Sequence, residues 1–203
     1  MTPRPSAVLW DIGNVIVRWD PRTLYAKIFP DPGQRDWFLA NICTMAWHVE
    51  SDRGMSMAGP VEALARQHPE HRDAILAWRA RWWEMFSGTI PQTEVAIEAL
   101  WARGVPQFGL SNMCGETYDG TIAMSPAFGR LGDIVVSGVE GVIKPEPRIY
   151  QIACERTGFE PGQMLFIDDN RANIEAARAL GFDTHLFEDP AALRPALEGR
   201  GLL

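Results

Sequence analysis

Short apolar runs that alternate with helical patterns constrain the fold of this chain more than any other feature. The apolar runs occur at residues 7–10, 107–110, 133–136, 164–167 and 184–187, and their length suits buried strands. Helical spacing of apolar residues follows at residues 94–103, 147–156 and 170–180. This order predicts an α/β fold with a doubly wound, Rossmann-like parallel sheet that is covered by helices on both faces.

Residues 21–89 break this alternation. They contain no convincing strand pattern but two helical stripes, at Leu39, Ile42, Cys43 and Ala46 and at Ile75, Trp78, Trp82 and Phe86. We therefore expect residues 21–89 to form a small inserted helical cap, and residues 1–20 and 90–203 to form the Rossmann-like catalytic core. Because Trp78 and Trp82 lie on a stripe, we expect them to fill the core of the cap rather than to stack on a ligand.

Charge and cysteine content disfavour several functional classes. The formal net charge of −7 disfavours binding to nucleic acid and to anionic membranes, so a phosphate group would need a local binding site. The first residues lack the apolar run of a signal peptide, and no stretch has membrane-spanning length. The three cysteines are an odd number without a Cys-x-x-Cys motif, as is usual in a reducing compartment. We expect a soluble cytoplasmic protein, a monomer or homodimer, that acts on a small molecule.

Polar clusters follow the predicted strands. They are residues 11–15, Ser111 with Asn112, residues 144–147 and residues 168–173. Taken singly, each cluster could be a turn, a helix cap or a solvated lysine. Ligands of parallel sheets bind beyond the carboxyl ends of the strands, where the four clusters are expected to meet. Asp168 and Asp169 would repel each other there, and a divalent cation is the usual remedy.

Together the four clusters resemble the four sequence motifs of the haloacid dehalogenase superfamily. The resemblance covers nearly the whole chain and is most specific at residues 144–150 and 166–177, whereas in the cap only residues 47–54 look similar. The first cluster is similar to that of small-capped phosphatases whose motif reads Asp-x-Gly-Asn-Val, a subgroup that includes sugar-1-phosphate phosphatases. The resemblance implies a magnesium-dependent phosphatase that acts on a small phosphorylated metabolite, for example a sugar phosphate.

The resemblance also implies a role for individual residues of the four clusters. Asp11 would attack phosphorus and form an aspartyl-phosphate. Mg²⁺ would be bound by Asp11, by the backbone carbonyl of Gly13 and by Asp169. The Ser111 hydroxyl and the Asn112 backbone N–H would hold phosphate oxygens.

Further roles follow from the same resemblance. Lys144 would bridge the phosphate and Asp11, and Asp168 would hold the waters of the metal. Asn173 would bond to Asp169 or to a metal-bound water. Four other residues are expected to contact the substrate: Asn14, Trp47, Asp52 and Arg53.

One position departs from the motif of most phosphatases in the superfamily. They carry a second Asp two residues after the nucleophile, which protonates the leaving oxygen, and here that position is Gly13. The neighbouring Asn14 cannot replace it, because an amide does not titrate. Either a cap residue supplies the proton, with Asp52 preferred over His48 and Glu50, or the substrate has an acidic leaving group.

Two alternative functions remain open at this stage. A metal-independent 2-haloacid dehalogenase would use the same Asp nucleophile, although it has no evident need for the adjacent Asp168 and Asp169. A non-catalytic binding protein of the same fold is the other alternative, and the intact set of Asp11, Ser111, Lys144 and Asp169 argues against it.

Overall fold

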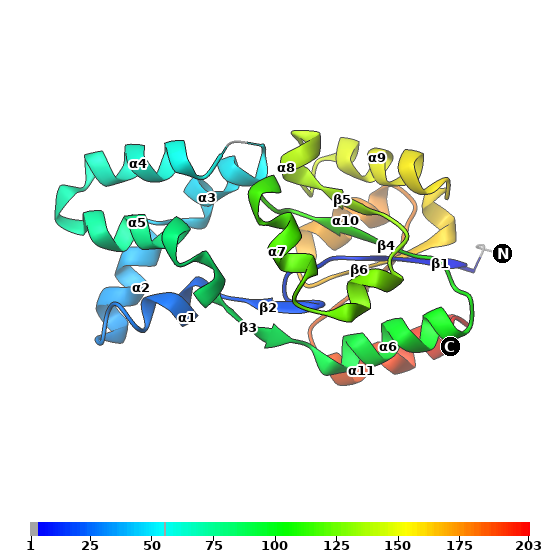
Figure 1. The fold of residues 1–203 in the computed structure, drawn as a ribbon. Helices are drawn as coiled ribbons and strands as arrows, with labels where there is room; N and C mark the ends of the chain where they lie inside the picture. Colours follow the sequence, from blue (N-terminus) through cyan, green and yellow to red (C-terminus); the bar gives the residue numbers. More distant parts are fainter. Residues whose placement is uncertain (1–3, 55) are drawn as a thin grey trace.

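A computed structural model describes residues 4–54 and 56–203 of the chain (Figure 1). Its main sheet has five parallel strands in the order β5-β4-β1-β6-β7. The strands are β1 (Ala7–Trp10), β4 (Gln107–Ser111), β5 (Ile134–Val136), β6 (Met164–Asp168) and β7 (Asp183–Leu186). The predicted parallel α/β sheet is confirmed. The ladders of β4 and β6 extend one residue further than expected, so Ser111 and Asp168 are the last residues of their strands.

Helices cover both faces of the sheet. Along β1, Val8 and Trp10 belong to one hydrophobic cluster, and Ala7 and Leu9 belong to the other, as the two-residue period of a strand requires. The first face packs against α6 (Pro91–Ala102) and α11 (Pro190–Glu198), the second against α9 (Pro147–Thr157) and α10 (Arg171–Ala179). Because both faces are covered, the central strands are apolar throughout, as their sequence indicated.

Shorter elements complete this part of the chain. They are η3 (Gly115–Thr117), α7 (Tyr118–Ile122), η4 (Pro126–Arg130), α8 (Ser137–Glu140) and η5 (Pro161–Gln163). Within the part of the chain that the structure describes, no helix is both long and apolar enough to cross a bilayer.

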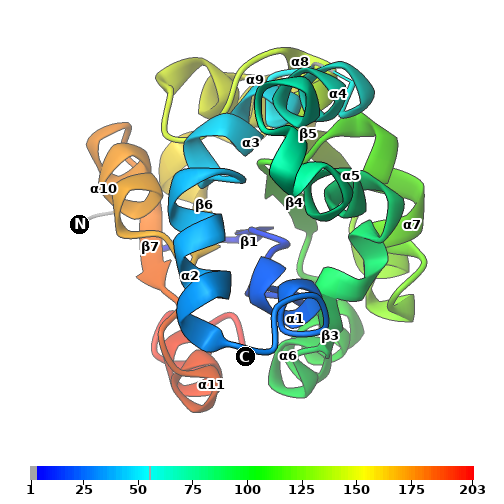
Figure 2. The same ribbon diagram turned by 90° about the vertical axis from the view of Figure 1, so that its left-hand side faces the viewer.

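A second group of helices lies at one end of the sheet, beyond the carboxyl ends of its strands (Figure 1). It comprises α1 (Pro21–Tyr25), α2 (Pro32–Asn41), α3 (Met45–Asp52), α4 (Ala58–Gln67), η1 (Pro69–His71), α5 (Arg72–Ala80) and η2 (Trp82–Met85). These helices share a hydrophobic cluster of their own, in which Tyr25, Phe38 and Trp78 are fully buried. Figure 2 views the molecule from this end, with the cap helices in front of the sheet. The exact domain boundaries at residues 21 and 89 stay a prediction.

A two-stranded antiparallel ribbon joins the two parts, and the sequence did not indicate it. The ribbon pairs β2 (Val17–Trp19) with β3 (Phe86–Thr89). The expectation that residues 21–89 contain no strand was therefore wrong at β3, and Phe86 does not continue the helical stripe, because α5 already ends at Ala80. β3 is short, lies at the surface and pairs with a distant segment, so its local pattern carries little signal.

Candidate active site

The carboxyl ends of three adjacent strands bring the polar clusters together. β1 lies between β4 and β6 in the sheet. Asp11 follows β1 directly, Ser111 ends β4, and Asp168 ends β6. All three side chains are buried. Neighbouring parallel strands end at the same edge, so the topology alone places two carboxylates and a hydroxyl within reach of one another.

Lys144 is the hub of this cluster. Its buried ammonium lies 2.8 Å from Oδ1 of Asp11 and 2.7 Å from Oδ2 of Asp168, and it donates to the backbone carbonyl of Leu110 at 2.9 Å. Burial by itself lowers the pKa of Lys144, but the carboxylates of Asp11 and Asp168 more than offset that effect and raise it. Lys144 is therefore a permanently charged group, held by three acceptors.

Asp11 is fixed through one of its two oxygens. Oδ1 accepts from the backbone N–H of Ile12 at 2.7 Å and faces the Lys144 ammonium. No donor among residues 4–54 and 56–203 contacts Oδ2. Burial, followed by the negative charge of Asp168, raises the pKa of Asp11 well above its ordinary value, and Lys144 only partly opposes this. The Asp11 carboxylate is thus held by donors on one of its two oxygens.

Three carboxylates converge on one point of the site. Ligand oxygens of Asp11, Asp168 and Asp169 all lie within 4.8 Å of one another. The Asp169 side chain is exposed, yet partial burial and then the charge of Asp168 raise its pKa. Such mutual repulsion is what a divalent cation relieves, and oxygen atoms are the ligands that Mg²⁺ prefers. The donor set therefore fits the expected magnesium, with Asp11 and Asp169 as protein ligands, and the Gly13 carbonyl as a ligand stays a prediction.

Asp168 differs from its expected role at a metal water. Its Oδ1 accepts from the backbone N–H of Asn170 at 2.7 Å, and its Oδ2 accepts from Lys144. Asn173 donates from Nδ2 to both oxygens of Asp168 at 3.1 Å. The protein partner of Asn173 is therefore Asp168 and not Asp169, because the first turn of α10 directs its amide to the strand end of β6, and the alternative bond to a metal-bound water stays a prediction. Asp168 has its acceptor capacity filled by these donors, and it positions Lys144.

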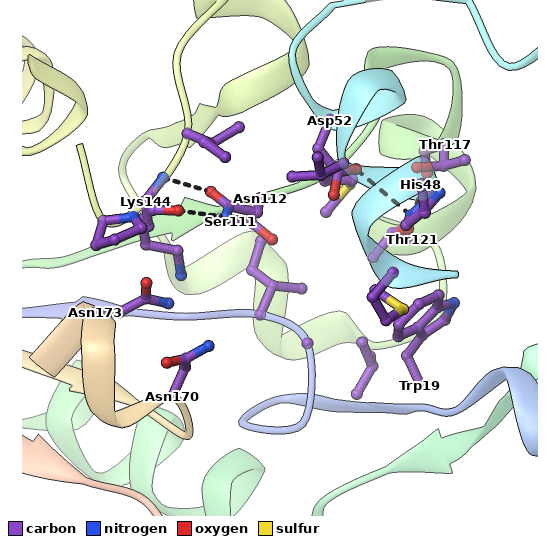
Figure 3. Close-up of a pocket in the computed structure, with 18 of the residues that line it drawn as sticks. Trp19, His48, Asp52, Ser111, Asn112, Thr117, Thr121, Lys144, Asn170 and Asn173 are labelled. Carbon is purple, nitrogen blue, oxygen red and sulfur yellow. Dashed lines mark hydrogen bonds and ion pairs between the residues drawn. The ribbon is translucent and has the colours of Figure 1, made fainter. Parts of the chain in front are cut away.

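Asn112 has a contact that the sequence did not indicate. Its side chain donates from Nδ2 to the carbonyl of Lys144 at 2.9 Å and accepts from the Lys144 N–H at 2.7 Å (Figure 3). This pair of bonds fixes the backbone of Lys144 while Asp11 and Asp168 fix its ammonium. The phosphate contact expected from the Asn112 backbone stays a prediction, as does the contact from the Ser111 hydroxyl, which lines the pocket beside it.

A pocket of about 430 Å³ opens between this cluster and the cap, within the volume range of small-molecule sites. At one end it is lined by Ser111, Asn112, Lys144, Asn170 and Asn173 (Figure 3). At the other end it is lined by residues of the cap, the ribbon, η3 and α7: Val17, Trp19, Met45, His48, Val49, Asp52, Trp82, Phe86, Thr117 and Thr121. Helix α3 supplies Met45, His48, Val49 and Asp52, whose spacing of three and four residues defines a single helix face.

The same helix explains why Trp47 does not reach the pocket. Trp47 lies on another face of α3 and packs edge-on against Trp78, with ring centroids 5.3 Å apart. It lines a separate surface hollow together with Glu50. The expected substrate contact of Trp47 is therefore not supported by its position, and Glu50 is not placed to donate a proton in the pocket. Trp82, expected to be only a core residue, belongs to the cap cluster and also lines the pocket.

Asn14 and Arg53 also lie outside the pocket lining. Arg53 forms an ion pair with Glu146 at 2.5 Å and so links the end of α3 to the segment that carries Lys144. Asn14 has a positive φ of 55°, and its Oδ1 accepts from the backbone N–H of Trp19 at 3.1 Å. A hydrogen bond from the Asn14 side chain lowers the pKa of Asp169. These positions indicate that both residues support the site rather than contact the substrate within this pocket.

Asp52 and His48 form a buried pair at the cap end of the pocket. His48 Nε2 lies 3.6 Å from Oδ1 of Asp52 (Figure 3). Burial raises the pKa of Asp52 to about 7, with Lys144 among the groups that oppose the rise, and burial lowers the pKa of His48 to about 4. Near neutral pH the imidazole is therefore uncharged, and a large fraction of Asp52 carries a proton.

Ser137 was missed by the sequence reasoning. This fully buried residue begins α8, and its Oγ donates to the backbone carbonyl of Asp52 at 2.6 Å while it accepts from the Met113 N–H at 3.0 Å. It thereby joins the end of α3 to the loop after β4. A serine after an apolar run resembles any helix cap, so only the long-range contact shows its role.

The fold and this site together define the class of protein. Residues 5–181 match the haloacid dehalogenase-like hydrolases, which is most of the chain, and the protein belongs to that family. The superfamily expected from the sequence motifs is therefore confirmed.

Curated relatives of different activities share parts of the sequence. The chain is 30% identical over 120 residues to mouse acyl-CoA dehydrogenase family member 10, which covers 57% of this chain and 11% of that protein. It is 31% identical over 94 residues to (S)-2-haloacid dehalogenase 1 of Pseudomonas sp. (strain CBS-3), covering 46% of this chain and 41% of the dehalogenase. A phosphatase of Mycobacterium tuberculosis is 30% identical over 104 residues, covering 51% and 48%. The matched segments thus span less than half of each of these relatives.

Solved structures match over nearly their whole length. A HAD family enzyme of Bacteroides thetaiotaomicron, in complex with magnesium and inorganic phosphate, has a TM-score of 0.67 and 19% identity and covers 93% of this chain and 98% of its own. A dehalogenase has a TM-score of 0.73 and 18% identity, covering 97% and 99%. At such identities the likeness shows the shared fold.

Proposed function

We propose that this hydrolase is a magnesium-dependent phosphatase that hydrolyses a small phosphorylated metabolite through an aspartyl-phosphate on Asp11. The observation that carries the proposal is the convergence of Asp11, Asp168 and Asp169 around one point beside the Lys144 ammonium. A cluster of three acids, two of them buried, and one lysine retains excess negative charge. That excess favours a bound cation between the protein and an anionic substrate.

In the first step, Oδ2 of Asp11 attacks phosphorus, and the bond between phosphorus and the leaving oxygen breaks. Lys144, held between Asp11 and Asp168, keeps its positive charge next to the reacting oxygens and stabilises the charge that develops during transfer. Ser111 lines the same end of the pocket and can donate its hydroxyl to a phosphate oxygen. In the second step, water attacks the phosphoryl group, which releases inorganic phosphate and regenerates the Asp11 carboxylate.

A bound Mg²⁺ would supply charge neutralisation between the substrate and the carboxylates and would help to orient the phosphoryl group. Asp11 and Asp169 would hold it, because their oxygens approach each other while Asp168 is saturated by Lys144, Asn170 and Asn173. The Bacteroides HAD family enzyme of the same fold, which was solved with magnesium and inorganic phosphate, supports this proposal.

The leaving oxygen needs a proton, and Gly13 cannot supply one. Asp52 is the titratable carboxyl group that lines the pocket at its cap end, and its raised pKa of about 7 keeps much of it protonated at neutral pH. We assign it the role of general acid toward the leaving group, with His48 beside it to hold its orientation.

A haloacid dehalogenase is the second candidate, because two relatives with matching segments have that activity. Such an enzyme would also use Asp11 as a nucleophile but would displace halide from carbon. The exposed carboxylate of Asp169 beside Asp11 would then repel an anionic 2-haloacid without a compensating cation. The carboxylate cluster therefore favours phosphate transfer.

The test is an assay of the purified chain on phenyl phosphate and on 2-chloropropionate, each with Mg²⁺ and with excess chelator. We expect hydrolysis of the phosphate ester that depends on Mg²⁺, and no release of chloride. Chloride release that is unaffected by chelator would contradict the proposed phosphatase function and support the dehalogenase function.

A further inference from the structure

The cap end of the pocket differs sharply in character from the phosphate end. Its walls are mainly apolar and aromatic: Val17, Trp19, Met45, Val49, Trp82 and Phe86. The polar groups there are His48, Asp52, Thr117 and Thr121. Both threonine hydroxyls already donate to backbone carbonyls, of Cys114 and of Thr117, at 2.9 and 2.8 Å. Whatever the leaving group is, it enters a chamber with few groups to solvate a charge.

No free cation serves this chamber among the described residues that line it. Lys144 is the lining residue with a permanent positive charge, and it is neutralised by Asp11 and Asp168. Arg53, next to Asp52 in sequence, is paired with Glu146, and Arg79 is paired with Glu116. His48 is buried and uncharged near neutral pH. A second anionic group on the substrate would therefore lose its water and gain no counter-ion.

Asp52 adds to this discrimination. A carboxylate or phosphate on the leaving group would lie near the Asp52 carboxyl group, which is itself buried. An anionic group on the substrate would raise the pKa of Asp52 further, and it would be repelled by the fraction of Asp52 that is ionised. The lining thus disfavours an anionic leaving group chiefly because it offers no counter-charge.

The aromatic side chains of the chamber are suited to bind an uncharged ring. Trp82 lies between Trp19 and Phe86, with ring centroids 5.5 and 6.1 Å away. The buried Nε1 atoms of Trp19 and Trp82 have no hydrogen-bond partner among the described residues. Indole rings pack against the flat faces of other rings, and their N–H groups donate to neutral oxygens.

We propose that the substrate is a phosphate monoester whose leaving group is an uncharged ring, a phenol or an uncharged cyclic alcohol, and that bisphosphates and phosphorylated acids are excluded. This inference rests on the proposed phosphatase function and narrows it to a substrate class. It follows from the lining of the cap chamber, which offers ring faces but no unpaired cation.

The first test compares two esters that differ in one charge. Phenyl phosphate and 4-carboxyphenyl phosphate have similar shapes and phenols of similar acidity, so intrinsic reactivity contributes little to their difference. With saturating Mg²⁺, we expect kcat/KM for the carboxylated ester to be lower by at least about tenfold. A hexose 1-phosphate and the corresponding hexose 1,6-bisphosphate form a second pair. We expect kcat/KM to be lower for the bisphosphate.

The second test changes the charge of the chamber. Met45 lines the pocket, but its side chain is 53% exposed at the start of α3, so a longer polar side chain can be accommodated there. Met45→Arg supplies the missing cation. It should raise kcat/KM for 4-carboxyphenyl phosphate, relative to that for phenyl phosphate, by about tenfold. Met45→Gln is the matched control, which changes polarity without charge and should keep the wild-type preference.

The outcomes separate this inference from the function on which it rests. A Mg²⁺-dependent phosphatase that hydrolyses both members of each pair with comparable kcat/KM overturns the substrate class alone. The same holds if Met45→Arg and Met45→Gln give the same selectivity. A chain that hydrolyses neither ester in Mg²⁺ overturns the phosphatase function, and the substrate class falls with it.

Discussion

The Lys144 ammonium lies 2.7 Å from Oδ2 of Asp168, and both side chains are almost fully buried, at 1% and 0% exposure. Asp11 flanks the same ammonium at 2.8 Å. Removing the lysine would leave two buried carboxylates without a counter-charge. We expect Lys144→Met to lower the free energy of unfolding by about 3–5 kcal/mol at neutral pH, as is usual when one partner of a buried pair is lost.

Urea unfolding in the presence of chelator measures this loss. The matched control is Lys27→Met, because Lys27 also forms an ion pair at 2.8 Å, with Glu84, but at the surface. Exposed pairs contribute little, so the control should unfold near the wild-type midpoint.

The loss of stability in Lys144→Met should also depend on pH. Since the pKa of Asp11 is raised in the folded state, protonation of Asp11 relieves the repulsion between the buried carboxylates. The deficit of Lys144→Met should therefore shrink at acid pH and grow as the pH rises through that raised pKa, whereas equal deficits at all pH values would contradict this account.

Asp11→Asn should abolish turnover while the fold persists, because an amide has nearly the same shape but is a poor nucleophile. The measurement is kcat on phenyl phosphate, combined with a thermal unfolding curve to show that the variant is folded. Trapping of the wild type with beryllofluoride should place the adduct on Asp11, as detected by mass spectrometry or crystallography. Unchanged turnover in a folded Asp11→Asn variant would remove the nucleophile from the proposal.

The positions of the chemical groups at the sheet edge were predictable from sequence for a physical reason. Buried parallel strands are apolar throughout, so the first polar residue after each run marks the carboxyl end of a strand. Asp11, Ser111 and Asp168 were found in this way, and the structure brings them together. The sequence pattern predicts the position of these residues because a strand that is buried on both faces must be apolar along its whole length.

Contacts between distant segments left no such local signal. The pairing of Asn112 with the backbone of Lys144, and of Ser137 with the carbonyl of Asp52, depends on loops that meet only in the folded chain. The misplaced Trp47 is a different case. Helical spacing within α3 could have shown that Trp47 shares no face with His48 and Asp52, whereas Met45, one turn before His48, does.

Asp169 should set the affinity of the site for Mg²⁺, because its carboxylate approaches that of Asp11 and has no lysine partner. We expect Asp169→Asn to weaken Mg²⁺ binding by at least about 10–100-fold, the range found even for groups that only support metal ligands. Titration calorimetry with Mg²⁺ alone measures this without reference to activity. Glu188→Gln is the control, since Glu188 lines the same hollow as Asp169 but lies outside the carboxylate cluster. Equal Mg²⁺ affinity in the two variants would place the metal elsewhere.

Asp52 should control the pH dependence of hydrolysis for substrates with poor leaving groups. The carboxyl group must be protonated to donate, and burial raises its pKa to about 7. For a cyclohexyl phosphate, kcat/KM should therefore be highest below pH 7 and fall as the pH rises through that value.

A positioned general acid contributes about 10²–10⁴-fold to the rate, so Asp52→Asn should lower kcat/KM for the alkyl ester by a factor in this range. The decline of kcat/KM at alkaline pH should disappear in the same variant. An activated aryl ester such as 4-nitrophenyl phosphate departs without a proton and should be affected far less. The other titratable groups associated with Asp52 are His48, Lys144 and Cys114. None accounts for a transition near pH 7, because the pKa of His48 is lowered to about 4, whereas those of Lys144 and of the Cys114 thiol are raised. The control is Glu50→Gln, because Glu50 lies on the same helix but lines a different hollow, and it should keep the wild-type profile for both esters. If Asp52→Asn slows the alkyl and aryl esters equally, with the pH profile unchanged, Asp52 contributes only to the shape of the pocket and the proton reaches the leaving oxygen by another route.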